Sequence, residues 1–416
     1  MSESNSFAVA AYQAVSFRAL LVFLGECLLY CYFLLPFGAE KVMSMFSLRA
    51  PAQAEEFGTV FPVYTFAHLL AVCIGLVLLI LVGLQPIKLN KPFVAYCVAN
   101  LAAIPWMFIF HTSSDPLYWD YVLELFRLFS LALLAIVVLE ERHYDPYVLV
   151  RCLAPLLIIP VALVIFTNVR DFLSAREGRI NAPGLEITST GHISAIAVIL
   201  GMSLPLRRPI RAVLFLVGGV SLLQSGSRLA LLGCLVCAGI VVWRQHKSTM
   251  HRARSLIAVV ILGALAIWFG STNLSGAERL GTLSDSETLT EEIASGRALA
   301  FLAACTVIYD HPLGYVDSDW SIQEKLVTAG FPSHTHSNYL QSYLRFGPWA
   351  ILFWGVFAYQ TAIGLKRSSP YAPAMCFVLV GSLFDYYTFV TKAMIIIFII
   401  ASLNAYHIRK WVKENK

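Results

Sequence analysis

Long uninterrupted apolar runs restrict the fold of this chain more than any other feature of its sequence. A helix needs about 20 apolar residues to cross the ~30 Å hydrocarbon core of a bilayer, because lipid offers the backbone no hydrogen-bond partners. Reading the sequence with that window gives about a dozen candidate spans. They begin near Phe17, Val60, Pro92, Leu117, Tyr147, Ser189, Ile210, Arg228, Arg254, Asn338, Tyr371 and Lys392. The two spans that flank Ser225-Gly226-Ser227 are also compatible with one long, broken helix. The sequence therefore predicts an all-α polytopic membrane protein with about 12 transmembrane helices.

The composition excludes other classes of protein. Hydrophobic residues make up 58% of the chain and charged residues 13%, whereas soluble domains are about half apolar and about a quarter charged. The aromatic content of 13% excludes a disordered chain. Most of the nine cysteines lie inside apolar runs, so they are expected to pack as small hydrophobic residues, Cys234 and Cys237 included. The net charge of +5 is not gathered in one basic patch, so nucleic acid is not an expected partner.

The positive charges are sorted along the chain, and this sorting predicts the orientation of the spans. Cytoplasmic loops of membrane proteins are short and rich in Lys and Arg. With the N-terminus in the cytoplasm, every second loop carries such residues: Lys88, Lys91, Arg142, Arg207, Arg208, Arg211, Arg244, Lys247, Arg252, Arg254, Lys366, Arg367, Arg409, Lys410, Lys413 and Lys416. We expect an even number of spans, both termini in the cytoplasm, and a first span that stays as a permanent anchor because no cleavable signal precedes it.

This topology divides the chain into three parts. Residues 1–269 hold nine transmembrane helices, 270–337 form a large loop outside the cytoplasm, and 338–416 hold the last three helices and a cytoplasmic tail. Within the loop, Arg297–Tyr309 is apolar and too short to span the membrane, which predicts a surface helix that ends before Pro312. A second short helix is expected over Ser321–Thr328.

Two helix starts on the outer side share the sequence Ser-Gly followed by Arg or Ser-Arg. In one, Ser227 and Arg228 follow Gly226, and in the other Arg297 follows Ser295-Gly296. A helix N-terminus presents unpaired N–H groups and a partial positive charge, and the guanidinium fork matches phosphate oxygens, so each start is a candidate anion site. The alternatives are an arginine that snorkels to the interface and, for Arg297, an ion pair with Glu291 or Glu292.

A polar segment at the start of the tenth span contains two histidines, His334 and His336, followed by Asn338. A neutral imidazole is suited to be a general base near pH 7, and packing or hydrogen bonding is the alternative role. No third histidine or cysteine lies nearby, so no zinc site is expected. Asp317 and Asp319 are interpreted as a solvated loop rather than a metal site.

One more acidic residue lies in the membrane region. Asp385, near the outer end of the eleventh span, is costly in lipid without a partner, for which Lys392 or an arginine is a candidate.

Four motifs occur here in a fixed order: Ser-Gly-Ser-Arg-Leu-Ala-Leu-Leu at 225–232, Ser-Gly-Arg at 295–297, His-Pro-Leu-Gly at 311–314, and His-Ser-Asn-Tyr-Leu with a later Phe-Gly over 336–347. In this set, in its number of spans and in its large outer loop, the chain resembles the O-antigen ligase/polymerase superfamily, and within it the ligases. The motifs lie between Leu214 and Ile351.

The resemblance implies a GT-C-type glycosyltransferase in the inner membrane of a Gram-negative bacterium, with its active site facing the periplasm. Such an enzyme moves a polysaccharide from undecaprenyl diphosphate to a sugar hydroxyl of lipid A–core, with inversion and without a metal or other cofactor. The family's histidine base falls on His336, and its two arginines fall on Arg228 and Arg297, which would hold the donor diphosphate together with Ser227.

Further residues are assigned supporting roles. Asn338, His334 and, as a weaker placement, Asp385 would support the base. The charged segment 169–188 carries Arg170, Arg176 and Arg179, which would meet the phosphates of the acceptor core, unless the segment is only a solvated loop. The sequence departs from the family pattern at Val316, where a second Gly often stands, and at Pro348-Trp349 after Gly347.

Several other activities are compatible with these features. A polymerase or a protein O-oligosaccharyltransferase of the same superfamily would use the same donor. A lipid-linked glycan transporter or flippase is an alternative of a different class, but it would be expected to show inverted repeats and helices broken near the bilayer midplane, which the sequence does not suggest.

Overall fold

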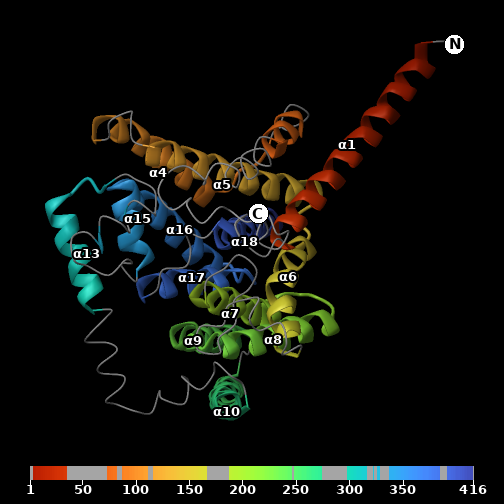
Figure 1. Ribbon diagram of the computed structural model, residues 1–416. Helices are drawn as coiled ribbons and strands as arrows, with labels where there is room; N and C mark the ends of the chain where they lie inside the picture. The colour runs from red at the N-terminus through yellow and green to blue at the C-terminus, as the bar shows by residue number, and fades with distance from the viewer. Residues whose placement is uncertain are drawn as a thin grey trace.

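The computed structural model describes residues 3–34, 73–81, 87–110, 116–165, 187–245, 248–273, 298–315, 322, 326–327, 337–384 and 391–415. Within these ranges every regular element is a helix (Figure 1). Three stretches of helix there are long and apolar enough to cross a membrane, judged by length and composition: Phe17–Leu34, Arg228–Gln245 and Lys392–Glu414. Shorter apolar helices accompany them. The protein is thus all-α and polytopic, as the apolar runs predict.

The helices follow the expected order along the chain. They are α1 (Glu3–Leu34), α4 (Lys91–Phe110), α5 (Pro116–Glu141), α6 (Pro146–Ile165), α7 (Ile187–Ser203), α8 (Arg208–Ser225), α9 (Arg228–Gln245), α10 (Thr249–Asn273), α13 (Ala298–Asp310), α15 (Asn338–Phe346), α16 (Trp349–Lys366), α17 (Ala372–Phe384) and α18 (Thr391–Glu414). The span expected to begin near Val60 starts outside the described residues. The surface helix expected over 297–309 is confirmed as α13.

The tenth span corrects the sequence analysis. One helix was expected from Asn338, but the chain forms a short helix, α15, and then a separate longer one, α16. The break lies at Gly347, whose φ of 63° belongs to the left-handed region, and at Pro348, which has no N–H to continue the ladder of α15. The longer helix of this pair is α16, with 18 residues, and α15, with nine residues, precedes it.

Helices α7, α8 and α9 form a tight group in which α8 runs antiparallel to the other two. Ser194 on α7 donates a hydrogen bond to Ser221 on α8 (2.9 Å between the oxygens). Farther along α7, Gln245 at the end of α9 donates to the carbonyl of Met202 (3.0 Å). The chain therefore turns back between α8 and α9, and the alternative of one long broken helix is wrong.

The bundle has two ends that the contacts define. At the Arg244 end, Arg244 of α9 donates to the carbonyl of Leu365 at the end of α16 (3.1 Å). The Arg367 guanidinium there lies 4.8 Å from the ring centroid of Trp411 on α18. The Arg228 end is opposite: α7, α9, α15 and α18 begin there, and α8 and α17 end there.

Several basic residues of the described chain gather at one end of the bundle. Arg211 bonds the carbonyl of Gly201 (3.1 Å), and Arg409 donates to the hydroxyl of Tyr144 (3.4 Å) in the turn between α5 and α6. Both contacts lie at the Arg244 end, together with Arg244 and Arg367. One end of the helix bundle thus carries these cations.

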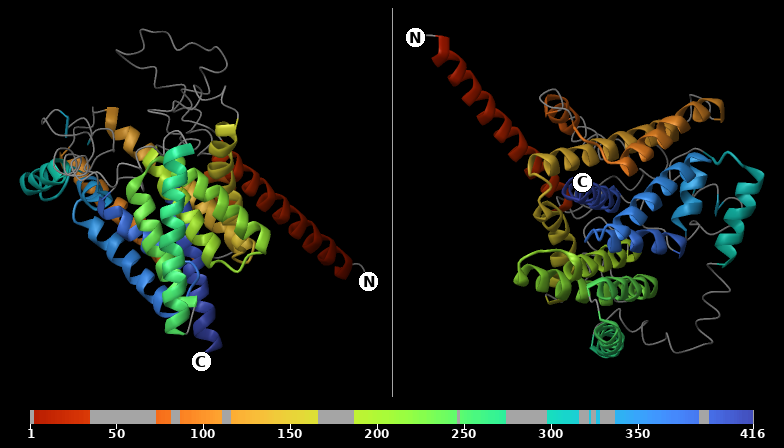
Figure 2. Two further views of the ribbon diagram at one scale, coloured as in Figure 1. Left: turned by 90° about the horizontal axis from the view of Figure 1, so that it is seen from below. Right: turned by 180° about the vertical axis from the view of Figure 1, so that it is seen from behind.

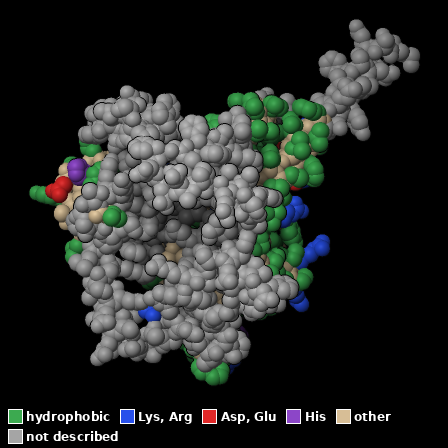
Figure 3. Space-filling view, in the orientation of Figure 1, with side chains coloured by type: hydrophobic (Ala, Val, Ile, Leu, Met, Phe, Trp, Pro, Cys, Tyr) green, Lys and Arg blue, Asp and Glu red, His purple; other side chains and the backbone are tan. Residues whose placement is uncertain are grey.

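Two ion pairs and the buried Lys392, whose Nζ donates to the carbonyl of Phe33 (3.3 Å), attach α1 to the rest of the molecule. Arg18 pairs with Glu141, and Arg142 pairs with the buried Glu26 (2.8 Å from Nη2 to Oε2). The bond with Glu26 raises the pKa of Arg142. The N-terminal part of α1 extends away from the bundle (Figure 2). Hydrophobic side chains, among them Phe17 and Phe23, lie exposed over its described half, as expected of a helix in contact with lipid (Figure 3).

Candidate functional site

The turn between α8 and α9 is a compact structure built by its own side chains. Gly226 ends α8 with φ 59° and ψ 21°, and its N–H donates to the carbonyl of Leu223. The Ser225 hydroxyl donates to the carbonyl of Leu222 (2.7 Å) and accepts from the Ser227 N–H (3.3 Å). The start of α9 is therefore held in one position, with Ser227 buried and Arg228 half-buried as its first residue.

This helix start has the chemistry of an anion site. The first N–H groups of α9 have no carbonyl one turn earlier to accept them, and the dipole of the helix places a partial positive charge there. The guanidinium of Arg228 adds a full charge and a fork of donors that fits two phosphate oxygens. Helix α9 thus begins at Arg228, as the sequence predicts, and Ser227 directly precedes it.

The start of α15 lies at the same end of the bundle and is fixed by α17. Ser337 donates to the carbonyl of Ser382 (3.3 Å), and the side-chain amide of Asn338 donates to the Ser382 hydroxyl (3.0 Å). Both residues are fully buried or nearly so. His336 directly precedes Ser337 in the chain, and Asp385 follows the last residue of α17, but both lie outside the described residues.

Helix α17 links the two helix starts. Its ring of Phe377 contacts α9 so closely that a Cβ on Gly233 would lie 2.9 Å from it. The same ring lies 5.5 Å from the imidazole of His192 on α7. Since α17 also carries Ser382, the helices that begin with Arg228 and Asn338 pack on one common helix and begin at the same end of it.

Most of the other predicted site residues are not described. His334, Arg297 and the three acceptor candidates Arg170, Arg176 and Arg179 lie outside the described residues, as do Asp317 and Asp319. Their positions therefore stay predictions. Among the predicted site residues that are described, Ser227, Arg228 and Asn338 lie at the Arg228 end of the bundle.

A second feature near α15 is the junction between the His-Pro-Leu-Gly segment and the end of α15. The N–H of Tyr315 donates to the carbonyl of Leu344 (2.8 Å), and the Tyr343 hydroxyl donates to the carbonyl of Pro312 (2.6 Å). Gly314 has φ 73°, and a Cβ there would lie 2.5 Å from the carbonyl oxygen of Tyr343. A residue with a Cβ would be strained at this φ and would collide with that oxygen, so the turn after α13 requires glycine at position 314.

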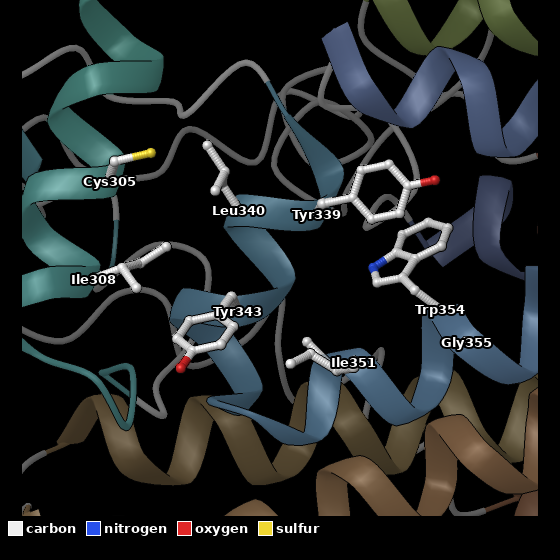
Figure 4. Close-up of a pocket in the computed structure, with 9 residues that line it drawn as sticks. Cys305, Ile308, Tyr339, Leu340, Tyr343, Ile351, Trp354 and Gly355 are labelled. Carbon is white, nitrogen blue, oxygen red and sulfur yellow. The ribbon is translucent and has the colours of Figure 1, made fainter.

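An apolar groove of about 530 Å³ lies between α13, α15 and α16 (Figure 4). Cys305 and Ile308 of α13 face Leu340 and Tyr343 of α15 across it, and α16 supplies the remaining wall with Ile351, Trp354 and Gly355. The Trp354 indole is fixed by a hydrogen bond to Ser342 (2.7 Å). The groove starts one residue beyond Asn338, so an apolar surface adjoins the polar start of α15.

The sequence analysis missed two buried residues near these elements. His192 is fully buried on α7, and Arg345 is 1% exposed on α15 with its guanidinium 5.5 Å from the ring of Phe346. The sequence contained a signal for both residues. A histidine within an apolar helix and an arginine at the end of a short one are costly to bury and therefore mark a site or a structural partner.

Comparison with known protein families gives a match, and it covers several of the helices described above. Residues 212–355 match the family model described as O-antigen ligase. This segment contains the Arg228 helix start, α13, the Gly314 junction, α15 and most of the groove wall on α16. No curated protein matches the chain. Over residues 212–355, the chain is therefore similar to the O-antigen ligase family.

Proposed function

We propose that this protein is an O-antigen ligase: a membrane glycosyltransferase that moves a polysaccharide from undecaprenyl diphosphate to a sugar hydroxyl of lipid A–core. The family match supports a glycosyltransferase of the ligase and polymerase kind. The single observation that carries the finer proposal is the common end shared by two helix starts, one led by Arg228 and one by Asn338.

The diphosphate is the leaving group of this reaction, and the Arg228 end supplies the charge that it needs. When the anomeric C–O bond breaks, negative charge develops on the diphosphate, and preorganised cations and N–H groups stabilise it. Arg228 and the first N–H groups of α9 take one part of this charge. Arg297, which directly precedes α13 in the sequence, takes the other part in our proposal, so that the diphosphate is held between the two arginines.

The acceptor hydroxyl loses its proton as it attacks, and His336 is the proposed base. An imidazole is neutral near pH 7 and can take this proton during a single displacement, which inverts the anomeric centre. The neighbouring residues support a fixed position for this segment, because both Ser337 and Asn338 are bonded to Ser382. His334, Asn338 and Asp385 are proposed to orient the base. This mechanism requires no metal, since arginines balance the phosphate charge.

The apolar groove supports a substrate linked to a lipid. Its volume of about 530 Å³ and its apolar lining suit part of one hydrocarbon chain beside a polar headgroup. An undecaprenyl chain is of this kind, whereas lipid A carries several acyl chains. We therefore assign the groove to the donor lipid, and the segment with Arg170, Arg176 and Arg179 to the phosphates of the acceptor.

The orientation follows from the positive charges. Because cytoplasmic loops are rich in Lys and Arg, we assign the Arg244 end to the cytoplasm and the Arg228 end to the periplasm of a bacterial inner membrane. The groove and both helix starts then face the side on which lipid-linked polysaccharides are presented. In this topology both termini are cytoplasmic, and the divisions 1–269, 270–337 and 338–416 are the membrane helices, the periplasmic loop and the final three spans with a tail.

Reconstitution tests the proposal directly. The purified protein in liposomes is given a polyprenyl-diphosphate glycan together with lipid A–core, a second glycan carrier, or a peptide that contains Ser and Thr. Transfer to lipid A–core alone supports the ligase. Transfer only to the second carrier makes the protein a polymerase, and transfer only to peptide makes it a protein O-oligosaccharyltransferase. Movement of the glycan lipid across the bilayer without transfer to any acceptor would make it a flippase and contradict the proposal.

A further inference from the structure

A second apolar groove lies beside the elbow at which α15 meets α16, and we name it the elbow groove. Its volume is about 440 Å³, and six side chains line it: Leu313, Phe346, Pro348, Trp349, Ile351 and Leu352. All six are hydrophobic, so the burial of an apolar ligand there is favourable. The proposed function uses only the first groove, the one between α13, α15 and α16, and assigns no ligand to the elbow groove.

The walls of the elbow groove come from two chain segments that are held against each other. Leu313 lies in the turn after α13, whereas the other lining residues belong to the end of α15 and the start of α16. The N–H of Tyr315 donates to the carbonyl of Leu344 (2.8 Å), and a Cβ on Gly347 would collide with the carbonyl oxygen of Leu313. The groove is therefore already formed, and a ligand that binds there does not have to order its walls.

The elbow groove is continuous with the first groove at one residue. Ile351 lines both grooves, and 67% of its surface is exposed. On α16, Trp354 and Gly355 line only the first groove, whereas Trp349 and Leu352 line only the elbow groove. A flexible hydrocarbon chain that passes over Ile351 therefore contacts both grooves without leaving the surface of the protein.

The order of the two grooves follows from α15. In Figure 4, Tyr339 and Leu340 lie at one end of the first groove, and Tyr343 and Ile351 lie at the other. Asn338, in the polar start of α15, directly precedes Tyr339. A lipid whose headgroup lies at the polar start of α15 thus meets the first groove before it meets the elbow groove.

The length of the donor lipid requires more apolar surface than the first groove offers. A groove of about 530 Å³ holds roughly one drug-sized ligand, whereas an undecaprenyl chain has about 55 carbon atoms. The first groove takes only the part of the chain nearest the headgroup, and the elbow groove is next in line. A single acyl chain of lipid A is much shorter and has no need of two grooves in series.

We propose that the elbow groove binds the distal part of the donor's polyprenyl chain, which crosses from the first groove at Ile351. This inference rests on the proposed function, in which the first groove holds the part of the same chain nearest the diphosphate. Two grooves in series make the affinity for the donor depend on the length of its lipid. The protein thereby distinguishes long polyprenyl carriers from short ones.

The test measures KM with donors that carry the same glycan on a short, a half-length or a full-length polyprenyl chain. Leu352→Trp fills the elbow groove, and Trp349→Ala removes part of its wall. Both residues are 40% exposed, so neither change is made in the core. Gly355→Leu fills the first groove instead. Leu216→Trp is the control for the added ring, because Leu216 is an exposed residue of α8 that lines neither groove.

Each donor is expected to give a different result. With the full-length donor, KM rises about tenfold in Leu352→Trp, in Trp349→Ala and in Gly355→Leu, because apolar contact with the chain is lost, and kcat changes little. With the half-length donor only Gly355→Leu raises KM, since this chain ends before the elbow groove. With the short donor none of the variants differs from wild type, and Leu216→Trp behaves as wild type throughout.

Three outcomes overturn the inference. An unchanged KM for the full-length donor in both elbow variants would remove the elbow groove from the donor site, and an equal rise with all three donors would give Trp349 and Leu352 a structural role. A rise in KM for lipid A–core alone would assign the groove to the acceptor. If one elbow variant does not fold, the other decides. Wild-type protein that transfers from no donor contradicts the proposed function, whereas active wild type with unaffected elbow variants contradicts only this inference.

Discussion

At the scale of single residues, the position of Arg228 gives its charge more effect than that of a surface cation. It begins a helix whose start is fixed by Ser225 and Gly226, so its guanidinium acts together with the helix dipole. We predict that Arg228→Ala and Arg297→Ala each lower kcat/KM for the lipid-linked donor by about a hundredfold, the usual loss for one preorganised oxyanion donor. Steady-state transfer in liposomes measures this.

Lys325→Ala is the control for these two variants. It removes one positive charge from the predicted loop 270–337, which also contains Arg297, but it does not lie in a Ser-Gly-Arg motif. We expect its kcat/KM to stay within about twofold of wild type, since Lys325 is not part of the proposed diphosphate clamp. A similar loss in all three variants would contradict the diphosphate clamp and indicate a general effect of positive charge.

The proposed base gives a second prediction at this scale. His336→Ala should abolish transfer, because no other group accepts the proton of the acceptor hydroxyl, while donor binding stays near the wild-type level. Product formation and binding of the donor to the purified variant are both measured. Asn338 tests the supporting role: Asn338→Ala loses one bond to Ser382 and is expected to be slow but active. Transfer by His336→Ala at the wild-type rate would rule out this base.

The residue scale also shows which parts of the site sequence reasoning could reach. Arg228 was predicted because a Ser-Gly-Ser-Arg break is a local signal for a helix start. The contact of α7 with this helix start was missed because it depends on how the helices pack. Nothing local to Gly191 reveals that it lies against Ser225, more than 30 positions later in the chain. Such contacts come from the packing of helices, which a single sequence does not contain.

At the scale of the elements, the junction after α13 depends on the backbone of Gly314. Its φ of 73° is unfavourable for other residues, and a Cβ would collide with the carbonyl oxygen of Tyr343. We predict that Gly314→Ala lowers the free energy of unfolding by about 2 kcal/mol or more. Thermal unfolding in detergent measures it. Gly219→Ala on α8 is the matched control, because nothing lies within 4 Å of a Cβ there. Equal stability of both variants would contradict the tight junction.

The groove gives a second prediction at this scale. A Cβ on Gly355 would also meet nothing within 4 Å, so Gly355→Leu fills the groove without displacing the helices around it. We expect KM to rise about tenfold for a donor with a full-length polyprenyl chain, because buried apolar contact with the chain is lost, and to stay unchanged for a donor with a short chain. KM is measured with both donors.

Gly219→Leu is the control for this variant, since it adds the same side chain to another open helix position. An equal rise in KM for short and long donors in Gly355→Leu would mean that the groove does not hold the donor lipid.

The elements themselves were largely predictable, apart from one break. The starts of α4 to α9 agree with the expected spans, because each apolar run ends in polar or charged residues. The break between α15 and α16 was not predicted, although Gly347 and Pro348 were noticed. Apolar residues continue on both sides of it, and hydrophobicity alone does not distinguish one long helix from two that meet at an angle.

At the scale of the whole molecule, the two ends of the bundle have different chemistry. Arg244, Arg367 and Arg409 bond or stack with carbonyls and aromatic rings at one end, whereas the other end has Arg228 beside buried hydroxyl and amide groups. The first pattern is typical of anchoring at a cytoplasmic interface. The second has the charge and the hydrogen-bonding groups for a phosphorylated glycan. In our proposal the division between anchoring and chemistry therefore follows the membrane normal, as the charge sorting in the sequence predicts.

This division predicts where each segment meets water. An enzyme reporter that is active only in the periplasm should be inactive when fused after Lys416 and active when inserted between residues 270 and 297, because an even number of spans returns the chain to the cytoplasm. Full-length insertion is checked by transfer activity of the same fusions. The reverse pattern would place Arg228 at the cytoplasmic face, where a polysaccharide attached to its lipid carrier for periplasmic transfer is absent. In that case the charged helix start would have to serve another anion, and the ligase would be excluded even though the helix packing stayed the same.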